Sequence, residues 1–189
     1  MLNKIRETVI PRIDRIGSIF AKTRISPNGW SIVGLLFAAL SGIAFSSLCG
    51  NWILGGSFLL ISGFFDIVDG SVARVTKTIS NRGAFLDSNF DRIAEILVYG
   101  GLISGAIGEP LVVFAALASS IMVSYTRAKG ESLNVNVSGI GIGERAERIF
   151  ILAVTSIMGF PYYGVILIVV LASLTFIQRF IYIIKKLEK

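Results

Sequence analysis

Six long apolar segments, separated by polar breaks, restrict what this chain can fold into more than any other feature. A transmembrane helix needs about 20 mostly apolar residues, and the candidate segments span residues 31–49, 52–73, 84–107, 110–127, 145–160 and 162–183. Three of the breaks are very short and contain turn-forming residues: Gly50-Asn51, Gly108-Glu109-Pro110 and Gly159-Phe160-Pro161. The pattern predicts an all-α membrane protein whose six transmembrane helices form three antiparallel hairpins.

The composition supports a membrane protein. Hydrophobic residues make up 53% of the chain and charged residues only 16%, whereas a soluble domain has about 25% charged residues. A length of 189 residues is enough for one domain. We therefore expect residues 1–189 to form a single membrane domain, with the six-helix bundle over residues 31–183.

The positive charges lie on one side of this arrangement. All 18 Lys and Arg residues lie before the first segment, around the second and fourth connections, or near the C-terminus. None lies in the three short breaks, so the positive-inside rule places both termini and the two long connections in the cytoplasm. We attribute the net charge of +6 to an anionic membrane surface and phosphorylated substrates, and expect no nucleic-acid partner.

The first 25 residues have a one-sided apolar pattern. Their apolar residues recur at helical spacing: Leu2, Ile5, Val9, Ile13, Ile16, Ile19 and Phe20. Basic residues occupy positions between them, which predicts an amphipathic helix over residues 1–25 at the cytoplasmic interface. We interpret the following Ser26-Pro27-Asn28 as the start of the first span, in preference to a direct substrate contact.

The residue types present exclude several kinds of chemistry. The chain has no histidine and one cysteine, Cys49. This excludes zinc sites built on histidine, a Ser-His-Asp triad and an internal disulfide framework. Acid–base and metal chemistry must rest on Asp, Glu, Lys, Arg or Tyr.

Four aspartates gather where the second segment ends and the third begins. Asp66 and Asp69 are three residues apart, and Asp87 and Asp91 are four apart, so each pair shares a helix face. Ionisable groups at membrane depth cost on the order of 3 kcal/mol each. Divalent cations would neutralise them, and oxygen ligands suit Mg²⁺, Mn²⁺ or Ca²⁺. A substrate carrying a pyrophosphate would supply the remaining ligands.

Small residues and an arginine accompany the aspartates. Gly70, Ala73 and Gly83 leave room for a nucleotide to approach the backbone, and Arg74 can offer a planar fork to a phosphate. Close packing between helices is the alternative interpretation of the glycines.

The order D-x₂-D-G-x₂-A-R-x₈-G-x₃-D-x₃-D resembles the signature of the CDP-alcohol phosphotransferases. All eight positions match: Asp66, Asp69, Gly70, Ala73, Arg74, Gly83, Asp87 and Asp91. The resemblance covers nearly the whole chain and implies six helices and a homodimer. It also implies that Mg²⁺, or alternatively Mn²⁺, is held by the four aspartates. The CDP-lipid would bind at Asp66, Asp69, Gly70, Ala73, Arg74 and Gly83.

The implied reaction is attack by an acceptor hydroxyl on the lipid-side phosphate of a CDP-lipid, with release of CMP. A carboxylate would take the hydroxyl proton. Spacing alone does not choose between Asp87 and Asp91 as this base; the resemblance implies Asp91.

Five cations expected near one cytoplasmic cavity point to a phosphorylated acceptor, because two or three cations make a phosphate site. They are Arg127, Lys129, Arg145, Arg148 and Arg179. Ordinary positive-inside charges, paired with Glu144 and Glu147, are the alternative.

The segments around these cations resemble the branch of the family that uses inositol phosphate, which contains phosphatidylinositol phosphate and archaetidylinositol phosphate synthases. Lys129 departs from an arginine usual there, which keeps the charge and alters the fork geometry. The expected reaction joins CDP-archaeol or CDP-diacylglycerol to an inositol phosphate. Glycerol 3-phosphate and serine are the alternative acceptors. A cation transporter is a more distant alternative, disfavoured because the outer halves of the segments are apolar.

Overall fold

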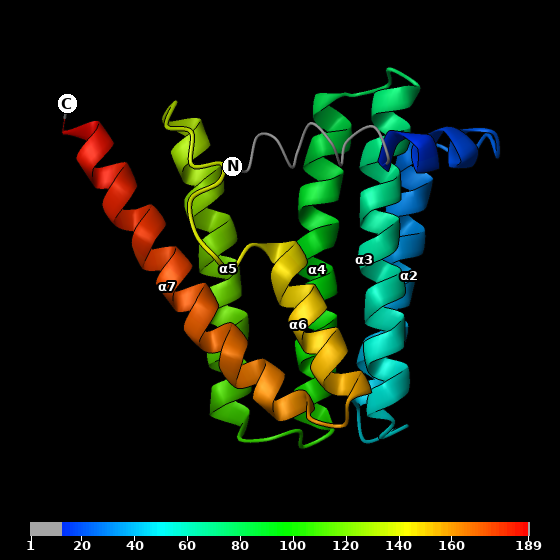
Figure 1. Cartoon of the computed structure of the whole chain (residues 1–189), viewed down its shortest axis with the longest axis vertical. Helices are drawn as coiled ribbons and strands as arrows, with labels where there is room; N and C mark the ends of the chain where they lie inside the picture. The colour runs from blue at the N-terminus through cyan, green and yellow to red at the C-terminus, as the bar shows by residue number, and fades with distance from the viewer. Residues whose placement is uncertain (1–12, 189) are drawn as a thin grey trace.

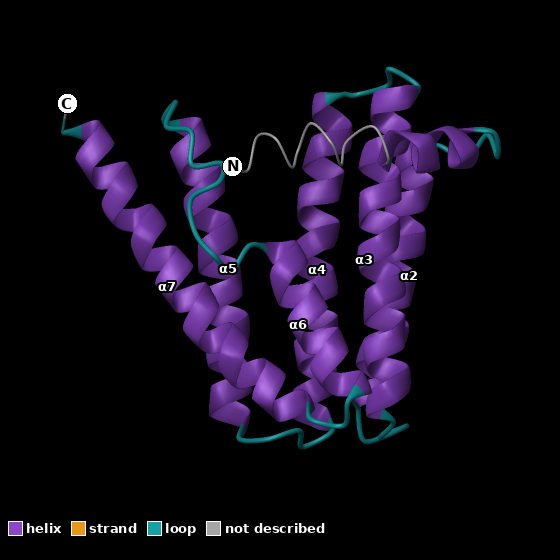
Figure 2. Ribbon diagram, viewed as in Figure 1, coloured by secondary structure: helices purple, strands orange, loops and turns teal. Residues whose placement is uncertain are grey.

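The structure, a computed structural model, describes residues 13–188 and contains only helices and loops in that range (Figures 1 and 2). A short helical stretch over residues 13–21 comes first. Six helices follow: α2 (Pro27–Phe45), α3 (Trp52–Val75), α4 (Asn81–Ser104), α5 (Pro110–Ser132), α6 (Arg145–Ile157) and α7 (Pro161–Leu187). Each lies within a few residues of a segment expected from the sequence.

Local capping explains where the helices begin. The Ser26 side chain accepts a hydrogen bond from the Gly29 N–H at 3.2 Å, and proline follows Ser26 at the first helical position of α2. Asn51 and Ser80 cap α3 and α4 in the same way. The Ser26-Pro27-Asn28 break is therefore a helix start, as predicted.

The helices pack as two groups joined by α6 and by a contact between α4 and α5. Helix α2 packs against both α3 and α4, α5 packs against α7, and α6 contacts α3 on one side and α7 on the other. The three short turns lie at one end of the bundle and the connection from α3 to α4 lies at the other (Figure 1). The fold thus separates a turn end from an end that carries the long connections, hereafter the loop end.

Four helices among residues 13–188 are long and apolar enough to cross a membrane: α2, α3, α5 and α7. Helix α4 matches the expected segment 84–107 but carries several charged residues, including Asp87, Asp91 and Glu95. Helix α6 has 13 residues and ends at Ile157, before the expected boundary at 160. It is only about 20 Å long at 1.5 Å per residue, so four of the six predicted spans meet the criteria of length and hydropathy.

The helical residues 13–21 lie across the ends of α2 and α3 at the loop end (Figure 1). Ile16 and Phe20 pack against a small cluster formed by Trp30, Val68 and Val72. Residues 1–12 of the predicted amphipathic helix lie outside the described residues.

Helices α2 and α4 approach each other closely through glycine. A Cβ atom added to Gly101 would lie 2.1 Å from the carbonyl oxygen of Gly42. Only glycine allows the two backbones to come this near. The contact fixes α4 beside α2 and so sets the position of the aspartates further along α4.

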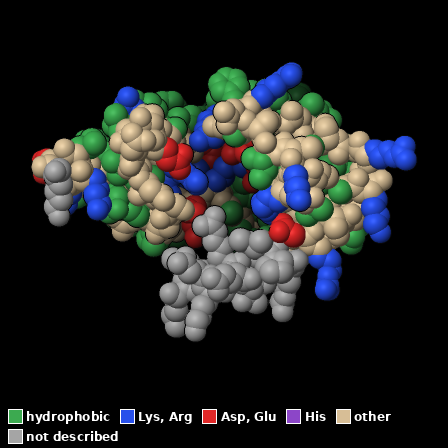
Figure 3. All heavy atoms as spheres, turned by 90° about the horizontal axis from the view of Figure 1, so that it is seen from above, with side chains coloured by type: hydrophobic (Ala, Val, Ile, Leu, Met, Phe, Trp, Pro, Cys, Tyr) green, Lys and Arg blue, Asp and Glu red, His purple; other side chains and the backbone are tan. Residues whose placement is uncertain are grey.

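The connection between α5 and α6 runs back into the bundle instead of staying outside it (Figure 1). Val135 and Val137 are buried, and the Thr175 hydroxyl of α7 accepts hydrogen bonds from the Ile142 and Gly143 N–H groups at 3.2 and 2.9 Å. Because α6 begins below the loop end, a hollow remains above its first turn. Acidic and basic side chains gather in this hollow when the molecule is seen from above (Figure 3).

Candidate active site

Three of the four signature aspartates form a compact trio. Asp66 and Asp69 come from α3 and Asp87 from α4, and one carboxylate oxygen from each lies within 4.8 Å of the others. Like charges this close repel unless a cation lies among them. An all-oxygen set of carboxylates is what Mg²⁺ and Mn²⁺ prefer. The residues present therefore fit a divalent cation.

Asp91 has a different partner. Its Oδ1 lies 2.7 Å from Nη1 of Arg145, and the same nitrogen lies 2.8 Å from Oδ1 of Asp66. Arg92 is further away, with Nη1 at 3.7 Å from Asp91 Oδ2. The sequence predicted Arg145 as a ligand of the acceptor phosphate; the fold places it between two of the aspartates and also at the wall of a second cavity, described below.

Ser31 on α2 was not foreseen. Its hydroxyl donates a hydrogen bond to Oδ2 of Asp69 at 2.5 Å, which orients that carboxylate. The signal that could have identified Ser31 is its position: it is a polar residue in the first turns of a span, at the same membrane level as the aspartates.

A cavity of about 530 Å³ lies beside the trio, between the start of α2 and the facing ends of α3 and α4. The signature residues Gly70, Ala73, Arg74 and Gly83 line it, together with Asp69 and Asp87. Its size is in the range of small-molecule sites. Thr78 and Ser80 also line it and were not foreseen. Ser26 and Asn28 line it too, in the segment for which the sequence analysis preferred a helix start to a substrate contact. We call this space the donor cavity.

Arg74 is held from the N-terminal side. Oδ1 of Asp14 accepts hydrogen bonds from Arg74 Nε at 3.1 Å and from the Ser71 hydroxyl at 3.2 Å. It also lies 3.0 Å from Arg74 Nη2. The helical residues 13–21 thus fix the guanidinium that lines the donor cavity.

A second cavity, of about 180 Å³, lies on the other side of Asp91. Arg127, Arg145, Arg148 and Arg179 line it, four of the five cations predicted for an acceptor phosphate. Lys129 is exposed near the end of α5 and is not among the lining residues. The other polar lining residues are Asp91, Arg92, Ser124 and Glu144. We call this space the acceptor cavity.

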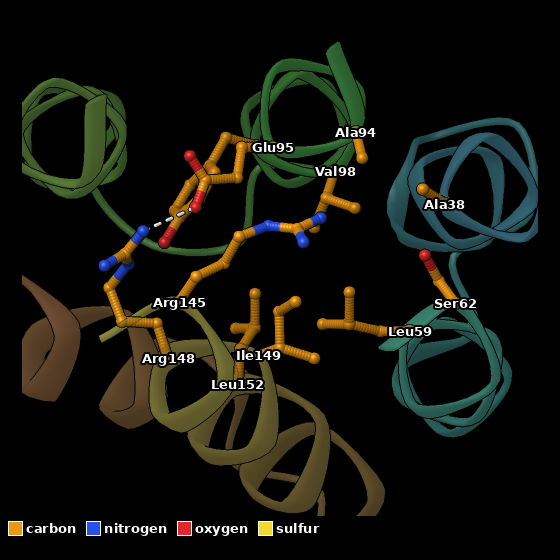
Figure 4. A pocket seen from close by; sticks show the side chains of 11 residues that line it. Ala38, Leu59, Ser62, Ala94, Glu95, Val98, Arg145, Arg148, Ile149 and Leu152 are labelled. Atoms are coloured by element: carbon orange, nitrogen blue, oxygen red, sulfur yellow. Dashed lines mark hydrogen bonds and ion pairs between the residues drawn. The ribbon is translucent and has the colours of Figure 1, made fainter. Parts of the chain in front are cut away.

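Arg148 is 2% exposed and pairs with a carboxylate that sequence reasoning missed. Its Nη2 lies 2.6 Å from Oε1 of Glu95, and its Nη1 donates to the Gly143 carbonyl at 2.8 Å. Figure 4 shows Arg145 and Arg148 reaching from α6 toward α4, where Glu95 meets Arg148. Glu95 lies four residues beyond Asp91, and this helical spacing was the signal that could have found it.

Arg179 is equally buried and joins three segments. It donates to the carbonyls of Ile140 and Val123 at 2.8 and 3.1 Å, and its Nη2 lies 2.9 Å from Oε1 of Glu144. These contacts tie α7 to α5 and to the loop before α6, so the wall of the acceptor cavity is built by residues far apart in the chain.

A carboxylate trio, a donor cavity on one side and an arginine-lined cavity on the other describe a membrane transferase that joins two anionic substrates. The family described as CDP-alcohol phosphatidyltransferase matches residues 24–178, and the chain belongs to this enzyme family. The archaetidylinositol phosphate synthase of Pyrococcus horikoshii is 38% identical over 188 residues, covering 100% of this chain and 99% of that protein.

Solved structures share the fold. A crystal structure of Mycobacterium tuberculosis phosphatidylinositol phosphate synthase with CDP-DAG bound has a TM-score of 0.78 at 22% identity, covering 90% of this chain and 92% of that one. A second structure of the same synthase, with manganese and citrate, also has a TM-score of 0.78 at 22% identity, with coverages of 90% and 88%. Family membership makes this a multi-pass membrane enzyme that uses a divalent metal, and sets the transporter alternative aside.

Proposed function

We propose that this chain transfers a lipid-phosphate unit from a CDP-lipid to a hydroxyl of an inositol phosphate and releases CMP. The arginine-lined acceptor cavity beside Asp91 is the observation that carries the proposal. An uncharged acceptor would not need the five arginines that line this cavity, whereas two or three cations make a phosphate site. The full-length similarity to an archaetidylinositol phosphate synthase supports the same acceptor and CDP-archaeol as the donor.

The donor half of the site would hold the CDP-lipid and Mg²⁺, with Mn²⁺ as the alternative metal. Asp66, Asp69 and Asp87 would bind the metal. Asp91 would join them, because Asp66 and Asp91 contact the same nitrogen of Arg145 and so lie close together. Gly70, Ala73, Arg74 and Gly83 would line the CDP site, as they line the donor cavity. Bound metal would stabilise charge on the pyrophosphate and orient CMP for departure.

Asp91 would act as the general base. It lines the acceptor cavity and belongs to the same helix as Asp87, so it stands between the two substrates. The acceptor oxygen attacks the lipid-side phosphorus, the bond from that phosphorus to the CMP oxygen breaks, and Asp91 takes the hydroxyl proton. Arg127, Arg145, Arg148 and Arg179 would hold the acceptor phosphate.

The membrane arrangement is also part of the proposal. We place the loop end in the cytoplasm, because the basic residues gather there and the short turns carry none. All six helices would cross the membrane, with α4 and α6 shielded by their neighbours, and the N-terminal segment would lie in the interface. Residues 1–189 would act as one domain within a homodimer, an assembly for which the family resemblance is the support.

The direct test is CMP release by the purified protein with Mg²⁺ and CDP-archaeol, offering inositol 1-phosphate, inositol, glycerol 3-phosphate and serine in parallel. Release with inositol 1-phosphate alone is the expected result. Release with glycerol 3-phosphate instead would keep the donor half and overturn the acceptor. Equal rates with inositol and inositol 1-phosphate would show that the acceptor cavity does not recognise a phosphate. Repeating the assay with CDP-diacylglycerol in place of CDP-archaeol tests which CDP-lipid the enzyme uses as donor.

A further inference from the structure

Glu95 is a buried acid that the proposed reaction does not use. It lies on α4 and is 8% exposed. An acid buried within a membrane helix is costly, and its presence points to a function. Glu95 lines a small internal cavity and is not among the residues that line the acceptor cavity. It therefore does not face the acceptor, and any effect on the acceptor must pass through a neighbouring side chain.

That neighbour is Arg148 of α6, which meets Glu95 between the two helices (Figure 4). Oε1 of Glu95 accepts a hydrogen bond from Arg148 Nη2 at 2.6 Å, and the Gly143 carbonyl accepts one from Nη1 at 2.8 Å. The two acceptors belong to different segments, α4 and the loop before α6. Because a guanidinium carries five N–H donors in one plane, these two bonds fix the directions of the other three.

Arg148 lines both the internal cavity and the acceptor cavity, so it connects Glu95 with the acceptor cavity. Arg127 and Arg179 line the same cavity, but their acids, Glu131 and Glu144, have side chains that are 50% and 41% exposed. The pair of Arg148 and Glu95 is buried on both sides. A group that is already fixed loses less conformational freedom on binding a ligand. Glu95 therefore sets the orientation of Arg148 before the acceptor arrives.

We propose that Glu95 is a positioning residue that holds the Arg148 guanidinium at the wall of the acceptor cavity, where it binds the phosphate of the acceptor. The inference rests on the proposed function, because it takes a phosphorylated alcohol as the acceptor. It adds a residue that contributes to recognition of the acceptor without touching it. The donor half of the site does not depend on Glu95.

The charge of Glu95 and its geometry act in opposite directions. A carboxylate beside Arg148 offsets part of the positive charge, so the charge alone would weaken the attraction for a phosphate. The bond to Glu95 also keeps the guanidinium in place and gives its buried Nη2 a partner. Without that bond, Arg148 must be reoriented before it can bind the acceptor. Removing the carboxylate would therefore tighten acceptor binding if charge dominates and weaken it if positioning dominates.

Glu95→Gln keeps the size of the side chain and removes the charge. With CMP release measured in Mg²⁺ and CDP-lipid, we expect the KM for inositol 1-phosphate to rise roughly tenfold. The kcat should change by less than about threefold and the KM for CDP-lipid should stay the same. An unchanged or lower KM for inositol 1-phosphate would overturn the proposal.

Tyr99→Phe is the matched control for damage to the packing. Tyr99 lies four positions beyond Glu95 on α4, is buried and lines the same internal cavity. Loss of its hydroxyl should leave the KM for inositol 1-phosphate unchanged. An equal rise of this KM in Tyr99→Phe and Glu95→Gln would assign the effect to packing and overturn the positioning role.

A double variant tests whether Glu95 acts through Arg148. Arg148→Met should itself raise the KM for inositol 1-phosphate. Adding Glu95→Gln to Arg148→Met should raise it no further, because the guanidinium to be positioned is gone. The double variant removes both members of the buried pair and so leaves no unpaired charge. A further rise equal to that of Glu95→Gln alone would show that Glu95 acts by another route.

Inorganic phosphate gives a readout that does not depend on turnover of the acceptor. Its inhibition constant against inositol 1-phosphate should rise in Glu95→Gln by the same factor as the KM, whereas inhibition by inositol should not change. Glu95→Asp keeps the charge and shortens the side chain, and it is the second variant if Glu95→Gln does not fold. We expect both constants to rise in Glu95→Asp as well, and the absence of a rise would overturn the proposal. The choice of acceptor by native protein tests the proposed function separately.

Discussion

Asp91 differs from the other signature aspartates in its surroundings. Asp66, Asp69 and Asp87 face one another, and Arg145 of α6 contacts both Asp66 and Asp91, but only Asp91 also lines the cavity on the far side. The spacing of the four signature aspartates in the sequence does not distinguish their roles. In the fold all four line one small space, and Asp91 alone among them also lines the acceptor cavity.

Replacing Asp91 with asparagine should test this distinction. The amide keeps the size of the side chain but cannot take a proton, so we expect kcat to fall by about 10²- to 10⁴-fold while CDP-lipid binding is retained. Single-turnover CMP release together with CDP-lipid binding by the same protein measures both quantities. A rate near that of the native enzyme would show that Asp91 is not the general base.

Arg127 is a suitable probe of the acceptor cavity because its side chain is 49% exposed and forms an ion pair with Glu131, four residues along α5. Arg127→Ala should raise the acceptor KM roughly tenfold, the size of one charge-assisted hydrogen bond, with little change in stability. Lys129→Ala is the matched control, since it removes an equal charge from the same helix outside the cavity. Equal shifts in both variants would point to general electrostatic attraction.

At the scale of whole elements, the site depends on how α4 is placed. Helix α4 carries Asp87, Asp91 and Glu95 on one side, and its position beside α2 is set where Gly42 and Gly101 meet. The short α6 then delivers Arg145 and Arg148 to that same side. A helix of 13 residues suits this task because its first turn begins inside the bundle, at the level of the acids.

Neighbouring glycines of α4 allow a matched stability test. A methyl group at Gly101 would collide with the Gly42 carbonyl, whereas a Cβ at Gly100 meets no other atom within 4 Å. We expect Gly101→Ala to lower stability by about 1–3 kcal/mol, as overpacking does. Gly100→Ala should be neutral or slightly stabilising, because alanine favours helix. Thermal unfolding in detergent compares the two, and equal melting temperatures would contradict close α2–α4 packing.

For the whole molecule, the arrangement concentrates polar groups at one end. Both cavities and the aspartates lie toward the loop end, while the opposite end carries the short turns. The buried charges of Arg148 and Arg179 are tolerable at this depth because each has carboxylate and carbonyl partners. The substrates would thus meet at one membrane surface.

Cys49 allows this orientation to be tested without altering the chain. It is the single cysteine and lies exposed in the turn between α2 and α3. In intact cells, we expect a membrane-impermeant maleimide to label Cys49 from outside. As the control, Glu188→Cys in a Cys49→Ser background should be labelled only after permeabilisation, because residue 188 follows α7 at the loop end. Labelling of Cys49 only after permeabilisation, with labelling of the Glu188→Cys variant in intact cells, would show that the topology is the opposite of the proposed one.

The sequence by itself determined the helices, their turns and the one-sided charge. Apolar segments, caps and turn residues act over a few positions, so they can be read locally, and the signature spacing places two pairs of acids on helix faces. Only the tertiary structure decided which side chains meet. Arg145 reaches Asp66 across 79 positions, and Arg148 reaches Glu95 across 53. Such contacts depend on the rotation and depth of packed helices, here on the close contact at Gly101 and on the depth in the bundle at which α6 begins. Helical periodicity carries no information about either.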